Sequence, residues 1–211
     1  MRFRSSLPLL IVGGIVASTA LAGCSAGGDP DPVFPTAATG LPDATSLSEP
    51  GSTVAAGEWG VLQTYDSVGD PRVSVVAMKT GPVRKGTASD LDDVTIPGGL
   101  PDDSIAYYAN ISYSVLEGDH HASPMHQLTA VDTTSDEHAT MLSVPSDLMN
   151  CPEQETEQAT DVKQQAVGCL VFVMPEGTTP DAVVFTATHS DELDTDVSPL
   201  TFTLPAAESA S

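Results

Sequence analysis

Hydrophobic and polar residues alternate with a period of two along much of the chain beyond residue 58. The clearest case is segment 105–115, in which every odd position is apolar or aromatic while the even positions include Asn110, Ser112 and Ser114. Successive side chains of a β-strand point to opposite faces, so this pattern predicts a long strand with one buried and one wetter face. Segment 200–204 repeats the alternation, with Leu and Phe separated by Thr, and is expected to form the last strand.

Segment 169–174 (Cys-Leu-Val-Phe-Val-Met) is instead apolar at consecutive positions, which is typical of a central strand in a packed sheet. The turn residues 175–177 follow it. A strand rich in Val and Phe is expected over 182–188, so these two strands are predicted to form a hairpin.

Further strands are expected wherever the period of two returns. These segments are 58–65, 72–78, 125–131 and 139–144. No stretch keeps the helical spacing of apolar residues over three turns, and the acidic, Gln-rich stretch at 153–166 is expected to form one or two helical turns or none. Short strands separated by Pro, Gly and Asp predict an all-β fold, an antiparallel β-sandwich of about 7–8 strands.

The first 23 residues have the three parts of an export signal. Arg2 and Arg4 form the positive start, and an uncharged, mostly apolar segment follows from Leu7 to Ala22. The strongly apolar run is short and is diluted by Gly, Ser and Thr, which is typical of a signal-peptide core rather than of a membrane span. Residues 1–23 are therefore expected to be a signal peptide.

The tetrapeptide Leu21-Ala22-Gly23-Cys24 resembles the lipobox of bacterial lipoproteins, in which small residues precede an obligatory cysteine. The resemblance implies a diacylglyceryl group on the Cys24 thiol and cleavage between Gly23 and Cys24. Two or three acyl chains hold a protein stably on a membrane, so the mature chain is expected on the extracytoplasmic face of the cell membrane. The alternatives are an ordinary secretory signal that contains a cysteine, and a transmembrane anchor.

Residues 24–57 are expected to form the lipidated N-terminus and a disordered, flexible linker. Pro alternates there with Gly, Ser, Thr, Ala and Asp, and no apolar period is found. A linker of this length would place the domain about 30–50 Å from the lipid. Segment 58–205 is long enough for one domain with a sizeable core, and 206–211 is expected to be a disordered tail.

The chain is strongly acidic. The whole sequence has 7 Lys and Arg against 29 Asp and Glu, and removal of Arg2 and Arg4 with the signal peptide changes the net charge from −22 to 5 − 29 = −24. This excess excludes nucleic acid as a partner and electrostatic docking on anionic lipid head groups. An acidic surface attracts cations and basic proteins, and solubility through self-repulsion explains the same excess.

The assignment of Cys24 to lipid leaves Cys151 and Cys169 as an even pair. In an exported protein such a pair, 18 residues apart, is expected to form a disulfide that stabilises the fold by about 3 kcal/mol. Two free thiols or a metal-binding pair is the alternative, but the chain has no Cys-x-x-Cys and no His between the two cysteines.

The order of these segments resembles a known family. A long strand at 105–116 is followed by a polar loop at 117–123 and by a strand that ends in an acid at 127–132; the Gly-x-Leu-Val-Phe-x-Met-Pro-Glu-Gly block at 168–177 then leads to 180–185. Together they resemble the immunoglobulin-like domain of uncharacterised Gram-positive lipoproteins, whose fold is similar to that of secreted immunoprotective antigens. The resemblance implies an immunoglobulin-like sandwich and assigns no chemistry to it.

Two kinds of side chain are candidates for binding a metal ion. His120, His121 and His126 lie close in the sequence, and imidazoles are good ligands for zinc or copper, but histidines that titrate in water explain the same residues. The acidic runs at 90–93 and 191–196 do not reproduce the calcium-loop pattern, and solvated turns explain them. No metal ligand and no cofactor is assigned.

The sequence contains no nucleophile elbow, zinc-protease helix, Walker loop or nucleotide fingerprint, so no catalytic residue is assigned and an enzyme is not expected. The expected function is that of a membrane-anchored, extracytoplasmic lipoprotein, a non-catalytic module that binds a protein or an envelope component. The alternative is a cation- or metal-binding lipoprotein that uses its acidic loops and histidines.

Overall fold

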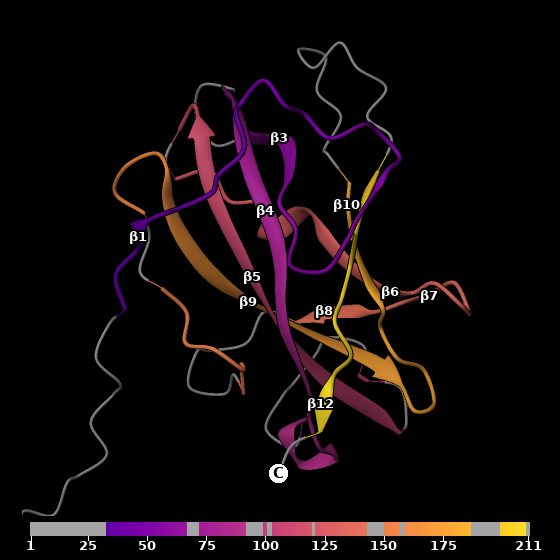
Figure 1. The fold of residues 1–211 in the computed structure, drawn as a ribbon. Helices are drawn as coiled ribbons and strands as arrows, with labels where there is room; N and C mark the ends of the chain where they lie inside the picture. Colours follow the sequence, from indigo (N-terminus) through magenta and orange to yellow (C-terminus); the bar gives the residue numbers. More distant parts are fainter. Residues whose placement is uncertain are drawn as a thin grey trace, which may run out of the picture. The chain divides into compact units, whose positions relative to one another are not determined.

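The described part of the chain is built from two β-sheets, with short 3-10 turns and no α-helix among its residues (Figure 1). In the computed structural model, the described residues are 33–66, 72–91, 99–100, 103–119, 121–142, 150–156, 159–186 and 199–209. The all-β sandwich expected from the sequence is confirmed. The predicted signal peptide over 1–23 and the predicted lipid site Cys24 lie outside the described residues.

The first sheet has seven strands in the order β1-β9-β5-β4-β12, with β3 also pairing with β4 and β8 also pairing with β9. Its strands are β1 (Thr36–Ala37), β3 (Gly60–Asp66), β4 (Arg72–Lys85), β5 (Ser104–Glu117), β8 (Thr140–Leu142), β9 (Gln164–Pro175) and β12 (Glu208–Ser209). The long antiparallel pairs β4–β5 and β5–β9 form its centre.

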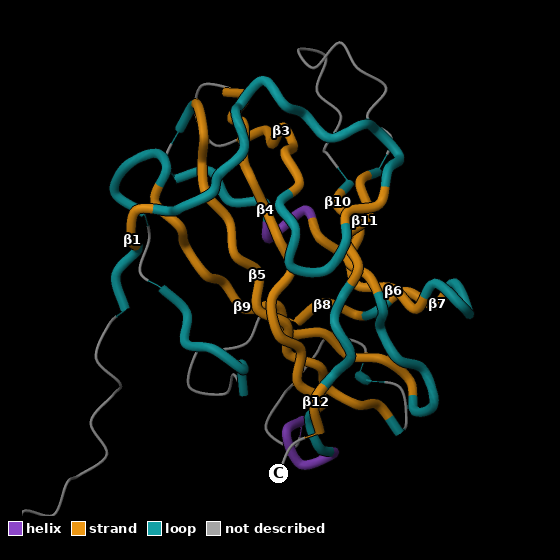
Figure 2. Tube along the Cα trace, in the orientation of Figure 1, coloured by secondary structure: helices purple, strands orange, loops and turns teal. Residues whose placement is uncertain are grey.

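The second sheet has five strands in the order β2-β11-β10-β6-β7. Its strands are β2 (Thr53–Val54), β6 (Leu128–Asp132), β7 (Glu137–His138), β10 (Ala182–Phe185) and β11 (Leu200–Thr203). Two 3-10 turns flank strands: η1 (Ala88–Leu91) follows β4, and η2 (Met125–Gln127) comes directly before β6 (Figure 2). Because of η2, the strand expected over 125–131 begins only at Leu128.

The two sheets share one hydrophobic core. From the first sheet, Tyr107 and Phe172 stack with ring centroids 5.9 Å apart and planes 8° apart. From the second sheet, Phe185 and Phe202 are buried in the same cluster, whose other members are mainly aliphatic. The odd positions of β5 point into this core, as the alternation predicts, and burial of apolar surface supplies the main stabilisation.

The even positions of β5 do not form the wetter face that the sequence predicts. Asn110, Ser112 and Ser114 are all buried, because other parts of the chain cover this outer face of the first sheet. Over Ala106 and Tyr108 the cover includes three partly buried hydrophobic residues. They are Leu91, Leu142 and Cys151.

The predicted hairpin between 169–174 and 182–188 is wrong. β9 pairs with β5, whereas β10 pairs with β6 and β11 in the other sheet. Both edges of each strand are taken by other strands, so none is left for a β9–β10 pair. The connection between them crosses from sheet to sheet: the Glu176 N–H donates to the carbonyl of Asp103, before β5, and the Asp181 N–H donates to the carbonyl of Val131 in β6.

Residues 33–57 of the expected linker lie against the sheets. β1 pairs with β9 in antiparallel orientation, and β2 pairs with β11 in parallel orientation. The Ser48 N–H also donates to the Val61 carbonyl at 2.8 Å, and the Val61 N–H donates to Ser48 Oγ at 3.0 Å. The expected tail contributes β12, which pairs with β4. Strands of two residues are too short to give a period of two, so sequence alternation does not detect them.

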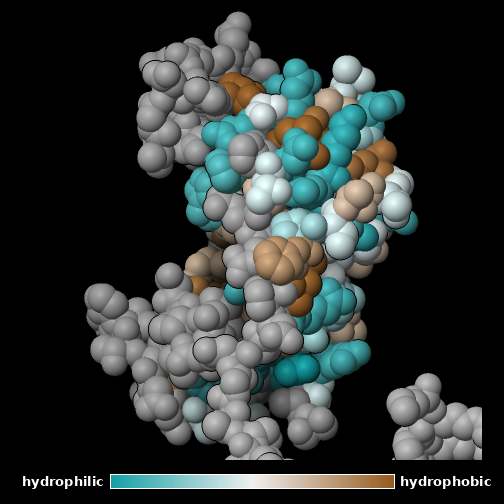
Figure 3. Space-filling view, turned by 90° about the vertical axis from the view of Figure 1, so that its left-hand side faces the viewer, coloured by the Kyte–Doolittle hydropathy of each residue, from teal (hydrophilic) through white to brown (hydrophobic). Residues whose placement is uncertain are grey.

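The described residues leave four large hydrophobic side chains exposed. They are Val33, Phe34, Leu47 and Val73, of which Phe34 is the most exposed at 67%. The face that bears β1 carries an apolar patch among hydrophilic residues (Figure 3). In the described part of the chain, no helix has the length and the hydrophobicity needed to cross a bilayer.

Replacement of Phe172 by alanine is expected to lower the free energy of unfolding by about 3–5 kcal/mol, since it removes a buried ring and leaves a cavity beside Tyr107. Chemical denaturation followed by circular dichroism measures the loss. The matched control is Phe34→Ala, which removes the same ring from an exposed position and is expected to change stability by less than about 0.5 kcal/mol. Equal losses for the two variants would contradict the assignment of the core.

Candidate functional site

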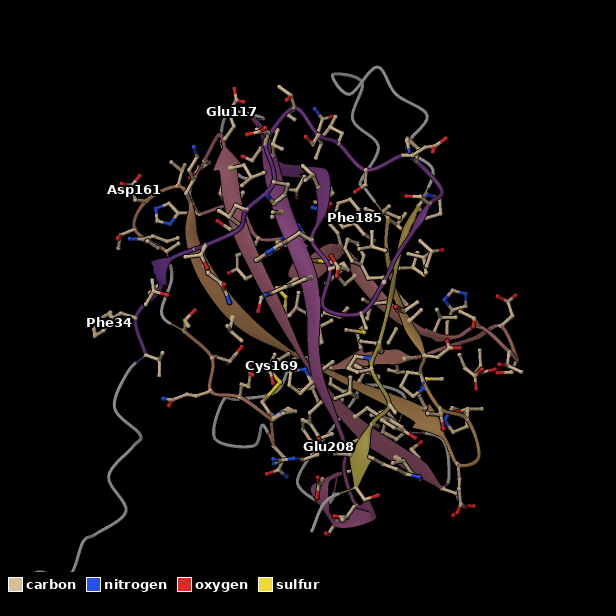
Figure 4. The ribbon with its side chains drawn as sticks, viewed as in Figure 1. Phe34, Glu117, Asp161, Cys169, Phe185 and Glu208 are labelled. Atoms are coloured by element: carbon tan, nitrogen blue, oxygen red, sulfur yellow. A yellow bond between two sulfur atoms is a disulfide. The ribbon has the colours of Figure 1, made fainter. Side chains whose placement is uncertain are left out.

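The predicted disulfide between Cys151 and Cys169 is present. The two Cα atoms lie 6.2 Å apart, and the two cysteines are 18 positions apart in the sequence. Cys169 is buried within β9 (Figure 4). Cys151 lies in an irregular segment outside the sheet. The bond therefore holds the segment that contains Cys151, which we call the cysteine loop (residues 150–156), against the outer face of the first sheet.

Asn110, at the centre of β5, forms two hydrogen bonds with the cysteine loop. Its Nδ2 donates to the Glu153 carbonyl at 3.0 Å, and the Glu153 N–H donates to Asn110 Oδ1 at 2.8 Å. The side-chain amide pairs with both the N–H and the C=O of one residue, as a neighbouring strand would. A buried amide needs such partners, because an unsatisfied polar group inside a protein is costly.

The cysteine loop also caps the edge of β9 between its partners β1 and β8. Glu155 Oε1 accepts a hydrogen bond of 2.8 Å from the Cys169 N–H. Thr156 and Val167 bond twice, through the Thr156 N–H to the Val167 carbonyl and through the Val167 N–H to Thr156 Oγ1, both at 2.9 Å. Backbone groups on an open strand edge would otherwise be free to pair with another chain, so the loop closes this edge.

Asp90 holds η1 against the same outer face. Its Oδ2 accepts hydrogen bonds of 3.1 Å each from the Tyr108 hydroxyl and from Asn150 Nδ2. Burial opposes the charged carboxylate, but hydrogen bonds from Thr87, Asn150 and Tyr108 outweigh it and lower the pKa of Asp90. Burial, and next the hydrogen bond to Asp90, raise the pKa of Tyr108 to about 12. The pair is therefore an anionic acceptor and a neutral donor at physiological pH, an arrangement that serves structure.

Asp132 ties the turn after β6 to the connection between β9 and β10. Its Oδ1 accepts from the N–H groups of Thr134 at 2.9 Å and Ser135 at 3.2 Å. Its Oδ2 accepts from the Thr179 N–H at 3.1 Å. The bond from Thr179, supported by those from the turn, lowers the pKa of Asp132, because N–H donors favour the charged form.

Asp181 makes a second tie between the same two segments. Its Oδ1 accepts from the Thr133 N–H at 2.9 Å and its Oδ2 accepts from the Thr133 hydroxyl at 2.6 Å. All four oxygens of Asp132 and Asp181 thus accept hydrogen bonds from the chain itself. A cation would have to compete with these donors, so the two carboxylates act as a clasp between segments.

The candidate histidines make separate local contacts. His121 donates its backbone N–H to Asp119 Oδ1 at 3.0 Å. His126 lies in η2, with its Nε2 2.9 Å from Gln127 Nε2. His120 lies outside the described residues.

Of the candidate acidic run at 90–93, the structure describes only Asp90 and Leu91. The other candidate run, 191–196, lies outside the described residues. Within the described ranges, no three or more His, Cys, Asp or Glu side chains gather into a group that could hold a metal ion.

Sequence reasoning finds the disulfide but misses Asn110, Glu155 and Asp132. The one usable signal is at Asn110, an amide placed between two apolar residues in the middle of a predicted strand, since such a group is either exposed or bonded to a partner. Glu155 is one of several acids in the stretch 153–166, and nothing in the sequence sets it apart.

Comparison with known proteins finds a weak structural similarity. No protein-family model matches the chain, and no match is found among curated proteins. A solved structure of a secreted protein from Mycobacterium tuberculosis, MPT63, is similar with a TM-score of 0.43 and 19% sequence identity, over 72% of this chain and 96% of that chain. No family membership follows from this match.

The double variant Cys151→Ala/Cys169→Ala is expected to lose about 3 kcal/mol of unfolding free energy, because the cross-link no longer restricts the unfolded chain. Urea denaturation of the two proteins measures the difference. Treatment with dithiothreitol should bring the wild-type protein close to the variant and leave the variant unchanged. A variant as stable as the oxidised wild type would show that the bond contributes nothing.

The contribution of Asp132 to the free energy of unfolding is expected to depend on pH. Its folded pKa is lower than the ordinary value of 3.8, so its contribution is present above that value and is lost as the pH falls through the folded pKa. The unfolding free energies of wild type and Asp132→Asn, measured from neutrality down to about pH 2, should therefore converge as the pH falls.

Asp136→Asn is the matched control for this titration, since Asp136 is an exposed residue of the same turn. A gap between wild type and Asp132→Asn that stays constant as the pH falls would contradict the role assigned to the Asp132 carboxylate.

Proposed function

We propose that the chain is a bacterial lipoprotein, held on the extracytoplasmic face of the cell membrane by lipid on Cys24, whose β-sandwich binds a protein or an envelope component without catalysing a reaction. The observation that carries the proposal is the combination of the lipobox Leu21-Ala22-Gly23-Cys24 with the disulfide between Cys151 and Cys169.

The disulfide supports export. Disulfides persist in oxidising compartments outside the cytoplasm and are rare inside it. This disulfide joins a buried strand to the loop that covers it. Its place in the fold agrees with a protein that matures outside the membrane, as the signal peptide and the lipobox predict.

The use of reactive side chains supports a non-catalytic role. The described cysteines share a disulfide, and the carboxylates of Asp90, Asp132 and Asp181 accept hydrogen bonds that hold loops in place. A general base needs a carboxylate or imidazole aimed at a substrate, and a nucleophile needs a free thiol or an activated hydroxyl. These groups serve the sandwich instead.

The charge supports a basic partner. The mature chain proposed here carries a net charge of −24, obtained from 5 basic and 29 acidic residues. Complementary charge raises the rate of encounter and selects against acidic partners. We therefore assign the binding partner to the basic proteins or cationic polymers of the cell envelope.

Mass spectrometry of the protein purified from membranes should find Cys24 as the first residue, carrying a diacylglyceryl group. Cys24→Ala should be recovered in the soluble exported fraction or with its signal peptide intact. The double variant Cys151→Ala/Cys169→Ala is the matched control, because it removes the two cysteines of the disulfide and should leave the protein on the membrane. An unmodified Cys24 in wild-type protein would overturn the anchor.

Crosslinking in cell envelopes tests the binding role. The lipidated protein is expected to capture a basic component that excess soluble Cys24→Ala protein displaces, with weaker capture at high salt because screening reduces the attraction. The absence of any component that the soluble protein displaces would contradict the proposal, and so would turnover of an envelope substrate by the soluble protein.

A further inference from the structure

We propose that the ring of Phe34 inserts into the interface of the lipid bilayer to which the chain is anchored, so that the β1 side of the domain rests on the membrane. The inference rests on the lipid anchor at Cys24 in the proposed function. It adds a contact surface and an orientation that the anchor alone does not supply.

Phe34 has the most exposed large hydrophobic side chain in the described part of the chain. It is 67% exposed, and its neighbour Val33 is 39% exposed. Its ring points away from the sheets into solvent (Figure 4). The face turned toward the viewer in Figure 3 is the side on which Phe34 projects, and an apolar patch lies on it among hydrophilic residues.

Backbone contacts on both sides hold Phe34 in this position. Val33 forms a parallel bridge with Thr156 of the cysteine loop. Beyond Phe34, β1 pairs with β9, and the Ala38 N–H donates to the Lys163 carbonyl at 3.0 Å. The outward ring therefore belongs to a segment fixed to the sandwich, so inserting it orders little additional chain and costs little entropy.

The anchor brings this ring within reach of the bilayer. Phe34 lies 34 − 24 = 10 residues after Cys24, and ten residues of fully extended chain span at most about 36 Å. One phenylalanine ring favours an apolar environment over water by about tenfold to hundredfold, too little to hold a free domain on a membrane. A tether of this length turns that weak preference into an intramolecular contact at high effective concentration.

The chemistry of the surface favours a lipid interface over a second copy of the chain. Residues 33–38 (Val-Phe-Pro-Thr-Ala-Ala) carry no charge. Two mature chains with a net charge of −24 each repel one another, whereas a zwitterionic lipid surface does not repel them. Phenylalanine, with tryptophan and leucine, is among the side chains that proteins lying on a membrane bury at the boundary between head groups and acyl chains.

Tryptophan fluorescence of the full-length lipidated protein tests the insertion. Trp59 is the single tryptophan of the chain, and Trp59→Phe keeps an aromatic ring beside Lys79 while providing a tryptophan-free background. Phe34→Trp is introduced into that background, and Leu47→Trp, which replaces a second exposed hydrophobic residue, is the matched control. Circular dichroism establishes that each variant keeps its sheet content.

Each protein is reconstituted in vesicles of phosphatidylcholine with and without bromine on the acyl chains. The Phe34→Trp protein is expected to show blue-shifted emission that brominated lipid quenches, and the Leu47→Trp protein neither. The same Phe34→Trp substitution in unlipidated Cys24→Ala protein should show no quenching at the same lipid concentration. Vesicles that contain phosphatidylglycerol should give weaker quenching at low salt than at high salt, because the acidic chain is repelled.

Absence of quenching in Phe34→Trp protein that mass spectrometry finds lipidated would overturn the inference and leave the anchor standing. A blue shift without quenching by brominated lipid would also overturn it, since the ring would then be buried against protein. Protein without lipid on Cys24 would overturn the proposed function and this inference together.

Discussion

The side chains of β5 alternate between two enclosed environments, and this double burial organises the molecule. On one side lies the core shared by the two sheets, with the stacked rings of Tyr107 and Phe172. On the other lies a cover made from η1, the cysteine loop and part of the N-terminal segment. The cysteine loop is irregular, so it brings polar backbone groups onto the sheet and needs specific hydrogen bonds to stay there.

Those bonds explain why polar residues occur where an apolar strand would suffice. Asn110 pairs with the backbone N–H and C=O of Glu153, Asp90 accepts from a tyrosine and an asparagine, and Glu155 caps a strand edge. The disulfide then prevents the loop from leaving. We interpret the candidate site as structural, because its bonds hold the covering segments on the outer face of the first sheet.

The sequence predicts the strands better than their partners. Alternation locates β5 and β11 and shows which face of β5 meets the main core, because that signal depends on one strand alone. The pairing of β9 is not predictable in the same way: the turn residues 175–177 indicate a change of direction but not a change of sheet. The extension of β4 past Gly81 and Pro82 is also missed, since the ladder continues there through a register shift that no local pattern reveals.

The two faces of β5 also explain why sequence reasoning misses Asn110 as a residue of the candidate site. Ser112 and Asn110 read as residues of a wetter face, and a polar residue that is buried against its own loop gives the same pattern as one that faces water. The disulfide was predictable because the count of cysteines leaves one pair. The clasp of Asp132 and Asp181 was not, because it joins segments whose proximity follows only from the crossing between the sheets.

Native-state hydrogen exchange of the oxidised and reduced protein tests most directly whether the cysteine loop encloses the outer face of the first sheet. The N–H of Glu153, bonded to Asn110, and the N–H of Cys169, bonded to Glu155, report on the cover, and the amides of β10 report on the core. Reduction is predicted to accelerate exchange at Glu153 and Cys169 by about a hundredfold, and the β10 amides show how much of this follows from the loss of global stability. Unchanged protection of the Glu153 amide after reduction would contradict the account.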